Sequence, residues 1–550
     1  IGTGTSTVEL KDLAGCDVFF LIGANPASNH PRLIHKLKDL RDRGGQIIVI
    51  NPAKEPGLVR FAVPKSAKSL LFGGTEIASK YLQPRIGTDI ILMKGIAKAV
   101  IEKAVAEPDA LDRQFIDRCT NGFQDFARDI ENIQWEDIVS HCGVTKRQIV
   151  EVAEVYCRSE NTVFAWGMGM THHTHGVENI EYISNLALLR GMVGKQNAGL
   201  LPLRGHSNVQ GIGTIGVKPV LPQDIFQHIE SYYSVKLPKQ RGMDTLACLE
   251  AAHAGELDFA LLMGGNLYGA SPDQCWAAEA LDRIPLKVFL TTTLNHGHVN
   301  GMTSSASLIL PVTARDEEWE PTTQESMFNF VRLSDGGIHR LDNVRPEVHI
   351  LSEIAARVLK DCSLDFSAFR KHKNIRKAIA ACVPGMEQLA SIDEHQREFH
   401  IPGRLIHQHL FKTVDRRASF RTHITITKKA SDPYPFTLMS VRSEGQFNTM
   451  IYEEEDSYRA TDDRWCVLLC PADIISLGIT GNDRVTLRSR CGEMAGLKVF
   501  PFDLPEKNVM AYFPEANILI SRNRDPRSQT PAFKSVDVQL EVVKGNQRVY

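Results

Sequence analysis

The chain has 550 residues, several times the length of an ordinary domain and enough to bury large cores. Lys and Arg total 63 and Asp and Glu total 65, so the formal net charge is -2 and gives no general attraction to nucleic acid or anionic lipid. No apolar run approaches the roughly 18 residues of a membrane span. Composition therefore indicates a multidomain protein with no nucleic-acid partner and no membrane span.

The 11 cysteines are scattered and form no Cys-x-x-Cys pair. The tightest pair, Cys466 and Cys470, has neither a second pair nor a nearby His to complete a zinc set. We expect no iron–sulfur cluster or zinc held by this chain alone, and scattered thiols suit a cytoplasmic location. The chain starts at Ile1 without Met or a signal-like stretch, so we expect it to begin partway through a larger protein.

The first 60 residues predict a β-α-β unit. Residues 18–22 are a short apolar run, typical of a strand buried on both faces. Residues 29–44 predict a helix that stops at two glycines, and residues 47–50 predict a second strand.

The same pattern recurs further along the chain. It predicts a helix over 145–158 capped by Thr145, a strand over 162–166, a helix over 178–192, and strands over 259–263, 288–290 and 308–310. Alternating strands and helices predict an α/β fold with doubly wound, mostly parallel sheets and helices on both faces. We assign residues 1–390 to this region.

Composition changes after residue 390. Residues 395–429 are rich in Arg, His and Lys, and we interpret 391–431 as a basic, solvated connector in preference to a nucleic-acid patch. From residue 436 onward, short alternating strands with Gly and Pro between them predict a β-barrel domain over 432–550.

Polar residues and glycines follow the predicted strands. In open α/β sheets, ligands bind beyond the carboxyl ends of the strands. These positions hold Asn25, Ser28, Asn29, Asn51, Gly167, Gly169, Gly265, Asn266 and Thr291. Glycine lets backbone N–H groups approach a phosphate. Each loop alone could be an ordinary turn, but together they favour a nucleotide-like cofactor, although the Gly-x-Gly-x-x-Gly fingerprint of nicotinamide dehydrogenases is not convincingly present.

A long polar loop over 199–211 carries Arg204 and His206 on either side of a glycine. Long loops inside compact domains are often functional. Arg204 could bind an anionic substrate through two N–H groups of its guanidinium, or it could form a structural ion pair. His206 could donate or accept a proton.

Two histidine-rich loops resemble metal sites. Residues 172–175 read His-His-Thr-His, and residues 295–298 read Asn-His-Gly-His. No Asp, Glu or Cys completes a set near 172–175, so we favour a cofactor contact, or packing, over metal ligation there. We interpret 295–298 as a loop near a ligand.

At these segments the chain resembles the molybdopterin-guanine-dinucleotide oxidoreductases, and among them the formate-dehydrogenase-like alpha subunits. The matching segments are 23–31, 48–52 followed by Glu55, 85–89, 166–169, 204–211, 441–448, 471–479 and 530–534. The resemblance implies two Rossmann-like domains interleaved in sequence and a carboxyl-terminal barrel of the six-stranded type. It also implies a molybdenum or tungsten ion held by two pterin-guanine dinucleotides.

By similarity, one dinucleotide would contact Gly23, Asn25, Ser28, Asn29, Asn51, Pro52 and Asp89. The other would contact Met168, Gly169, His172, Gly265 and Asn266. Arg442, Gln446 and Asn448 of the barrel would close over the pterins, with Asn517, Phe533 and Lys534 nearby.

The activity that this resemblance implies is two-electron oxidation of formate or a similar small oxyanion, with Arg204 and His206 as catalytic residues. The family's amino-terminal part, with its metal ligand and iron–sulfur cysteines, is absent from this chain, so a 4Fe-4S cluster would be held by residues before Ile1. A redox partner protein would take the electrons. The alternative is a non-catalytic descendant that binds cofactor or transfers electrons within a larger redox complex.

Overall fold

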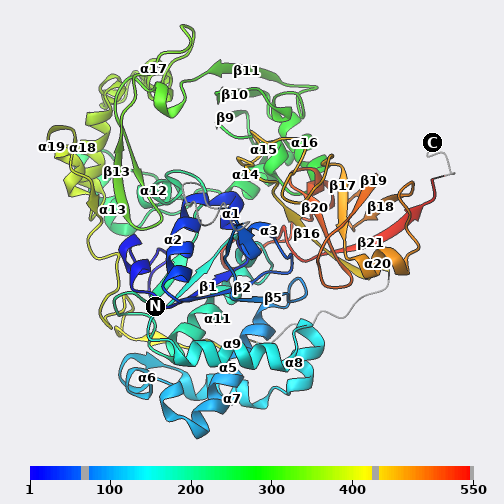
Figure 1. The fold of residues 1–550 in the computed structure, drawn as a ribbon. Coiled ribbons are helices and arrows are strands. Elements are labelled where there is room, and N and C mark those ends of the chain that lie inside the picture. Colours follow the sequence, from blue (N-terminus) through cyan, green and yellow to red (C-terminus); the bar gives the residue numbers. More distant parts are fainter. Residues whose placement is uncertain (63–73, 424–432, 546–550) are drawn as a thin grey trace. The chain divides into compact units, whose positions relative to one another are not determined.

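The computed structural model describes residues 1–62, 74–423 and 433–545 (Figure 1). The chain divides into two compact units. Unit 1 comprises Ile1–Leu203 together with Leu405–Tyr550, and unit 2 comprises Arg204–Arg404. Unit 2 therefore lies, in sequence, between the two parts of unit 1, as expected for interleaved domains.

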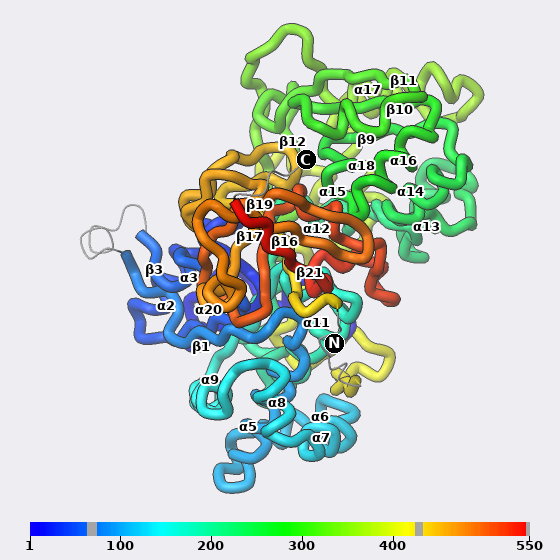
Figure 2. Tube along the Cα trace, turned by 90° about the vertical axis from the view of Figure 1, so that its right-hand side faces the viewer, coloured from blue at the N-terminus to red at the C-terminus, as the bar shows by residue number. Residues whose placement is uncertain are grey.

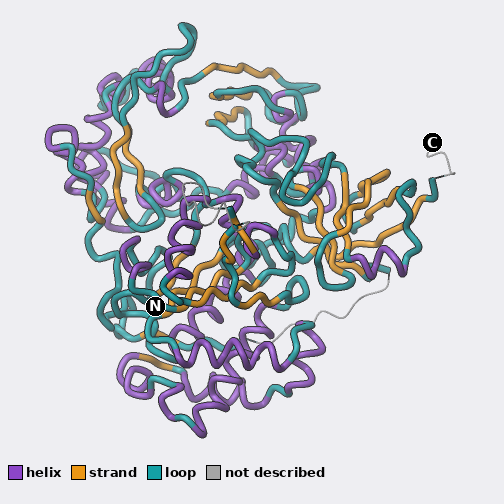
Figure 3. Tube along the Cα trace, in the orientation of Figure 1, coloured by secondary structure: helices purple, strands orange, loops and turns teal. Residues whose placement is uncertain are grey.

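A five-stranded parallel sheet forms the centre of the first part of unit 1, with strand order β5-β2-β1-β7-β8. Its strands are β1 (Val18–Ile22), β2 (Gln46–Ile50), β5 (Lys80–Leu82), β7 (Thr162–Trp166) and β8 (Gly199–Pro202). β1 and β7 are buried along their whole length, because helices cover both faces of the sheet (Figure 3). The strands predicted over 18–22, 47–50 and 162–166 are confirmed.

Helices alternate with these strands. They are α1 (Pro26–Asn29), α2 (Pro31–Asp42), α3 (Pro56–Val59), α5 (Asp89–Ala106), α6 (Arg113–Cys119), α7 (Phe123–Asn132), α8 (Trp135–Cys142), α9 (Lys146–Arg158), α10 (Met168–Thr171) and α11 (Gly176–Leu189). α5 packs against α7, α8, α9 and α11 (Figure 2). Thr145 caps α9 as predicted: the Gln148 N–H donates to Thr145 Oγ1 at 3.3 Å, and the Thr145 N–H donates back to Gln148 Oε1 at 3.1 Å.

The strand order of unit 1 reverses between β1 and β7. The chain runs outward from β1 to β2 and β5, then returns to place β7 on the other side of β1. A ligand crevice forms at such a switch point, beyond the carboxyl ends of the two strands. The topology therefore brings the loops after β1 and β7 together.

Unit 2 contains a smaller parallel sheet, of order β11-β10-β9, and an antiparallel sheet, of order β12-β13-β14. The strands are β9 (Phe259–Met263), β10 (Leu286–Thr291), β11 (Ala306–Pro311), β12 (Thr322–Glu325), β13 (Phe330–Ser334) and β14 (Phe399–His400). The helices are α12 (Val209–Thr214), α13 (Gln223–Tyr233), α14 (Thr245–His253), α15 (Leu267–Ala270), α16 (Gln274–Asp282), α17 (Glu347–Val358), α18 (His372–Cys382) and α19 (Ile392–His395). The strands predicted over 259–263, 288–290 and 308–310 are confirmed.

The edge strand β9 differs from the expectation of helices on both faces. Phe259, Leu261 and Met263 point to the same face and are 51%, 38% and 51% exposed. α17 packs on the neighbouring strand β10, where Val288 and Leu290 are buried. One helix does not reach across the whole face, so the edge strand keeps one side open.

The carboxyl-terminal part of unit 1 is a closed six-stranded barrel of order β16-β20-β17-β19-β18-β21. Its elements are β16 (Phe436–Val441), β17 (Cys466–Leu469), α20 (Pro471–Ser476), β18 (Arg484–Arg488), β19 (Glu493–Pro501), β20 (Asn508–Tyr512) and β21 (Val536–Val543). Alternate side chains of these strands fill its interior, including Leu438, Val467, Leu487 and Val509. The predicted barrel is confirmed.

The segment before the barrel corrects one expectation. Phe411, Ala418 and Phe420 are buried in the core of unit 1, and Ala418–Ser419 pairs with Thr120–Asn121 as the short strands β15 and β6. Apolar anchors among the basic residues therefore fix this part of the connector, which is not solvated along its length. Residues 424–431 of the connector lie outside the described residues, and the boundaries at 390 and 431 remain predictions.

Among the described helices, none combines the length and the apolar character needed to cross a bilayer.

Candidate functional site

Two glycine loops meet at the switch point of unit 1. Gly23, after β1, has φ +55, and its carbonyl accepts a 3.0 Å hydrogen bond from the Gly169 N–H of the loop after β7. A Cβ on Gly169 would lie 2.6 Å from the Gly23 oxygen. The N–H of Gly23 donates to the Ile50 carbonyl. These glycines let the two loops come into contact, and their N–H groups are used within the protein.

Amide and hydroxyl side chains surround this contact. Asn25 Oδ1 is buried and has no hydrogen-bond partner among the described residues. Ser28 Oγ donates to the Ser443 carbonyl of the barrel at 3.3 Å, and Asn29 is exposed. An unpartnered buried acceptor is costly unless a ligand supplies the missing donor. Asn25 is therefore a ligand-binding candidate, while Ser28 joins the crevice to the barrel.

The loops after β2 and β5 add three predicted residues. Asn51 Oδ1 accepts the Ala53 N–H at 3.1 Å, so this side chain shapes the loop, and the Pro52 carbonyl accepts from Gln83 Nε2 at 3.1 Å. Asp89 lies buried in the first turn of α5. Burial raises the pKa of its carboxyl to about 7.

The barrel contributes the loop from Arg442 to Asn448. Gln446 builds this loop: its Oε1 accepts the Ser443 N–H at 2.9 Å, and its Nε2 donates to the Asn448 and Phe513 carbonyls, both at 2.7 Å. Both Nε2 hydrogens are thus used within the protein. Asn448 has φ +51, a left-handed conformation, at the first position of the turn that joins Phe447 to Ile451.

Three basic side chains lie close together where the barrel meets the β7 loop. Burial, followed by the charges of Lys534 and Arg442, lowers the pKa of His172 to about 3. Burial, followed by the charges of Arg442 and Arg459, lowers the pKa of Lys534 to about 7, and burial also lowers that of Arg442. Within the described ranges, no carboxylate pairs with Arg442 or Lys534, although Lys534 Nζ donates to the Ser440 carbonyl. His172 is therefore neutral at physiological pH, and the repulsion between Arg442 and protonated Lys534 favours a bound anion.

Aromatic rings line the same region. The Phe533 ring lies 5.4 Å from that of His172 and 6.0 Å from that of Phe513, and the Arg442 guanidinium lies over Phe513.

Asn517, from the short helix Glu515–Leu519, is fully buried. His173 Nε2 pairs with the Gly169 carbonyl at 2.8 Å, which supports packing over metal ligation for this histidine. Met168 is 40% exposed.

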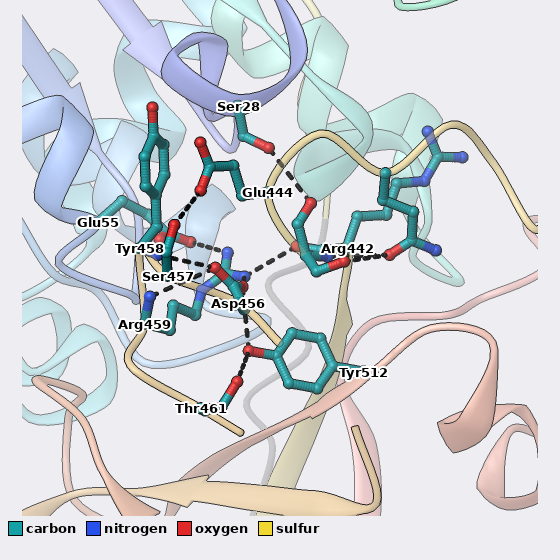
Figure 4. Close-up of polar contacts among 12 residues, drawn as sticks. Ser28, Glu55, Arg442, Glu444, Asp456, Ser457, Tyr458, Arg459, Thr461 and Tyr512 are labelled. Carbon is teal, nitrogen blue, oxygen red and sulfur yellow. Dashed lines mark hydrogen bonds and ion pairs between the residues drawn. The ribbon is translucent and has the colours of Figure 1, made fainter. Parts of the chain in front are cut away.

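The sequence did not predict a buried network beside these residues (Figure 4). Arg459 bonds Glu55 at 2.6 Å and Asp456 at 2.8 Å. The hydroxyl of Tyr512 donates to Asp456 at 3.0 Å. In the sequence, Glu55 is only one residue of a segment that resembles the family, and no spacing of residues points to Arg459.

In unit 2, the loops after β9 and β10 contact each other. Gly265 has φ +74, and its carbonyl accepts from Asn295 Nδ2 at 3.2 Å. Asn266 caps α15 by accepting the Gly269 N–H at 2.8 Å. His298 is buried, and its Nδ1 accepts the Asn295 N–H at 3.1 Å. The predicted loop 295–298 therefore lies against the predicted residues Gly265 and Asn266.

Arg204 lies half-buried at the start of unit 2, beside a buried carboxylate. Burial lowers the pKa of Arg204, the charge of Glu325 raises it, and that of Arg404 lowers it. Glu325 is 3% exposed and pairs with Arg404 at 3.0 Å. Gln210 also donates to Glu325, at 2.5 Å. The guanidinium groups of Arg204 and Arg404 therefore both interact electrostatically with the carboxylate of Glu325. His206 follows Arg204 on the same loop.

Comparison with known proteins agrees with this architecture. Residues 2–357 match the molybdopterin oxidoreductase family model, and residues 436–537 match the molydopterin dinucleotide binding domain. Protein YdeP of Escherichia coli is 32% identical over 566 residues, which cover 98% of this chain and 74% of YdeP. Formate dehydrogenase H of Escherichia coli is 24% identical over 99% of this chain and 75% of its own length. Acetylene hydratase from Pelobacter acetylenicus shares the fold with TM-score 0.70 at 15% identity, covering 98% of this chain and 79% of its own.

A parallel-sheet crevice closed by a barrel is an architecture for binding a dinucleotide cofactor. The chain belongs to the molybdopterin oxidoreductase family. Its cofactor is molybdenum held by two molybdopterin guanine dinucleotides. The crevice fits this group: Asn25 Oδ1 is a buried acceptor without a partner in the described chain, and Arg442 and Lys534 are cations suited to an anionic diphosphate.

Proposed function

We propose that the protein oxidises formate or another small oxyanion by two electrons. The observation that carries this proposal is Arg204, a half-buried guanidinium beside the Glu325–Arg404 pair. A planar fork in a partly desolvated site suits the two oxygens of a carboxylate. Similarity to formate dehydrogenase H supports the same substrate class.

In this proposal each residue has one task. Arg204 binds both substrate oxygens and stabilises the charge that develops on them. The ring of His206, two residues further on, accepts the proton released from carbon. When bound, the molybdenum centre supplies the two-electron oxidation.

The cofactor contacts are also part of the proposal. Gly23, Asn25, Ser28, Asn29, Asn51, Pro52 and Asp89 would line one dinucleotide, and Met168, Gly169, His172, Gly265 and Asn266 the other. Arg442, Gln446, Asn448, Asn517, Phe533 and Lys534 would cover the pterins from the barrel. The basic side chains of Arg442 and Lys534, next to the ring of His172, support the barrel side of this assignment.

The experiment is metal and pterin analysis of the purified protein, followed by assays of formate and other small oxyanions with an artificial electron acceptor. We expect stoichiometric molybdenum, extractable pterin and dye reduction that depends on formate. Absence of both metal and pterin would reject the proposal. A fully loaded protein that oxidises no oxyanion would favour a non-catalytic role in a larger redox complex.

A further inference from the structure

The guanidinium of Arg459 joins three segments of unit 1 (Figure 4). Its Nη2 bonds Glu55 Oε1, in the loop after β2, at 2.6 Å. Its Nη1 donates to the Arg442 carbonyl, in the loop after β16, at 2.8 Å, and to Asp456 Oδ2 at 2.8 Å. A single side chain therefore ties the α/β region to the barrel loop that carries Arg442.

This junction is buried. The side chains of Arg459, Glu55 and Asp456 are 5%, 4% and 1% exposed. Burial alone would lower the pKa of Arg459, but the charges of Glu55 and then Asp456 outweigh it and raise that pKa. Arg459 is therefore charged at any physiological pH, and its removal would leave two buried carboxylates without their cation.

Neighbouring contacts hold the same loop one residue further along. Ser28 Oγ donates to the Ser443 carbonyl at 3.3 Å, and Arg464 Nη1 donates to Ser443 Oγ at 2.8 Å. Two successive carbonyls, those of Arg442 and Ser443, thus accept hydrogen bonds from outside the loop. All of these bonds are made by the protein alone.

Arg459 is also the cation that pairs with the two carboxylates of this network. Glu55 and Asp456 are the carboxylates of this network, and Arg459 bonds both. Arg442 and Lys534 repel each other in a poorly solvated place, and no described carboxylate pairs with either. With Arg459 absent, Glu55 and Asp456 would lie buried without their cation, and the Arg442 carbonyl would lose its 2.8 Å hydrogen bond.

We propose that Arg459 is a positioning residue for the dinucleotide cofactor. It fixes the backbone of Arg442 and engages the nearby carboxylates, so that the guanidinium of Arg442 faces the crevice before the cofactor arrives. This inference rests on cofactor binding in the unit 1 crevice and is independent of the substrate.

The test is Arg459→Lys, which keeps one charge but cannot reproduce the fork that reaches three acceptors. Hydrogen exchange of peptides covering residues 442–448 is measured on cofactor-free protein, and pterin content is measured on protein made with cofactor. We expect exchange in 442–448 to rise about tenfold and pterin content to fall about fivefold.

The matched control is Arg376→Lys in unit 2. Arg376 is a buried arginine that also forms a forked pair, with Asp393, and donates to the Pro321 carbonyl. We expect a similar fall in melting temperature, with exchange in 442–448 and pterin content unchanged. Equal pterin loss in both variants would show that general stability, and not loop position, governs loading, and would overturn the proposal.

A second variant, Glu55→Gln, keeps the proposal testable if Arg459→Lys does not fold. It keeps an oxygen acceptor for Arg459 Nη2 but removes the charge, so exchange in 442–448 should rise by a smaller factor. Unchanged exchange in this variant, or in Arg459→Lys, would overturn the positioning role. Wild-type protein that contains no pterin at all would instead reject the proposed function, while the exchange measurements would still decide the role of Arg459.

Discussion

Units 1 and 2 both place arginines near strand-end loops, but they balance the charge differently. In unit 1, Arg442 and Lys534 lie together without a carboxylate pair among the described residues. In unit 2, Arg404 pairs with the buried Glu325, and Arg204 lies in the field of both. The first arrangement favours binding of an anionic cofactor. In the second, the protein's own carboxylate raises the pKa of the neighbouring guanidinium.

The two parallel sheets differ as well. Phe20 and Phe164 of unit 1 are fully buried and stack with ring centroids 4.7 Å apart. Phe259 and Met263 of unit 2 belong to an equally apolar run but are each 51% exposed. An apolar run therefore identifies a strand, while its place in the sheet decides how much of it is buried.

The largest expected effect tests this contrast between the sheets. Phe164→Ala should lower the free energy of unfolding by about 4 kcal/mol, because it opens a cavity in a closed core. Met263→Ala should cost less than about 1 kcal/mol, because the side chain is half exposed. Urea denaturation measures both, and equal losses would show that β9 is covered in the folded protein.

The next effect tests the charge balance of unit 2. Arg404→Met should cost about 3 kcal/mol, because Glu325 stays buried without its paired cation. The double variant with Glu325→Gln should regain most of that loss, since it removes the stranded charge. Urea denaturation decides the outcome, and a double variant no more stable than Arg404→Met would contradict this account.

Arg204→Lys tests the catalytic side of the comparison. We expect turnover to fall about 100-fold with cofactor content unchanged, because an ammonium cannot bind two oxygens in a plane. Steady-state assays together with pterin analysis measure this. Arg332→Lys, at an exposed ion pair with Glu398, serves as the control and should leave turnover unchanged. Full activity of Arg204→Lys on every oxyanion would reject the assigned role.

The smallest effect concerns pH and unit 1. The pKa of Lys534 is lowered from 10.5 to about 7 in the folded, cofactor-free protein. Between these values only the unfolded chain binds the proton, so stability rises with pH in this window. From pH 7 to 9, wild type should gain about 2 kcal/mol relative to Lys534→Met. A pH-independent difference between the two unfolding curves would contradict the lowered pKa.

Local patterns predicted most of the elements, because their causes are local. Short apolar runs marked the parallel strands, and Thr145 with Gln148 marked the start of α9 through its capping box. The expectation of a connector solvated along its whole length was wrong, because Phe411 and Phe420 pack into the core of unit 1. Burial of these rings depends on distant segments that composition does not reveal.

The candidate site divides in the same way. Residues near strand ends, such as Asn25 and Arg204, could be named because parallel strands gather their carboxyl ends at one edge. Arg459 could not be named: its partner Glu55 lies 404 residues away, and a lone arginine in a barrel loop has no sequence signature. The close contact between Gly23 and Gly169 could not be named either, because it joins two loops that lie far apart in the sequence.

By itself the sequence determined the α/β and barrel classes, the order of the strands along the chain, and the family resemblance. These depend on periodicity, turn residues and ordered segments that any folded form must keep. Only the tertiary structure decided which charges meet, that Arg459 ties the β2 loop to the barrel, and that one face of β9 stays open. The physical reason is that burial and ion pairing depend on distances across the fold, which the order of residues does not state.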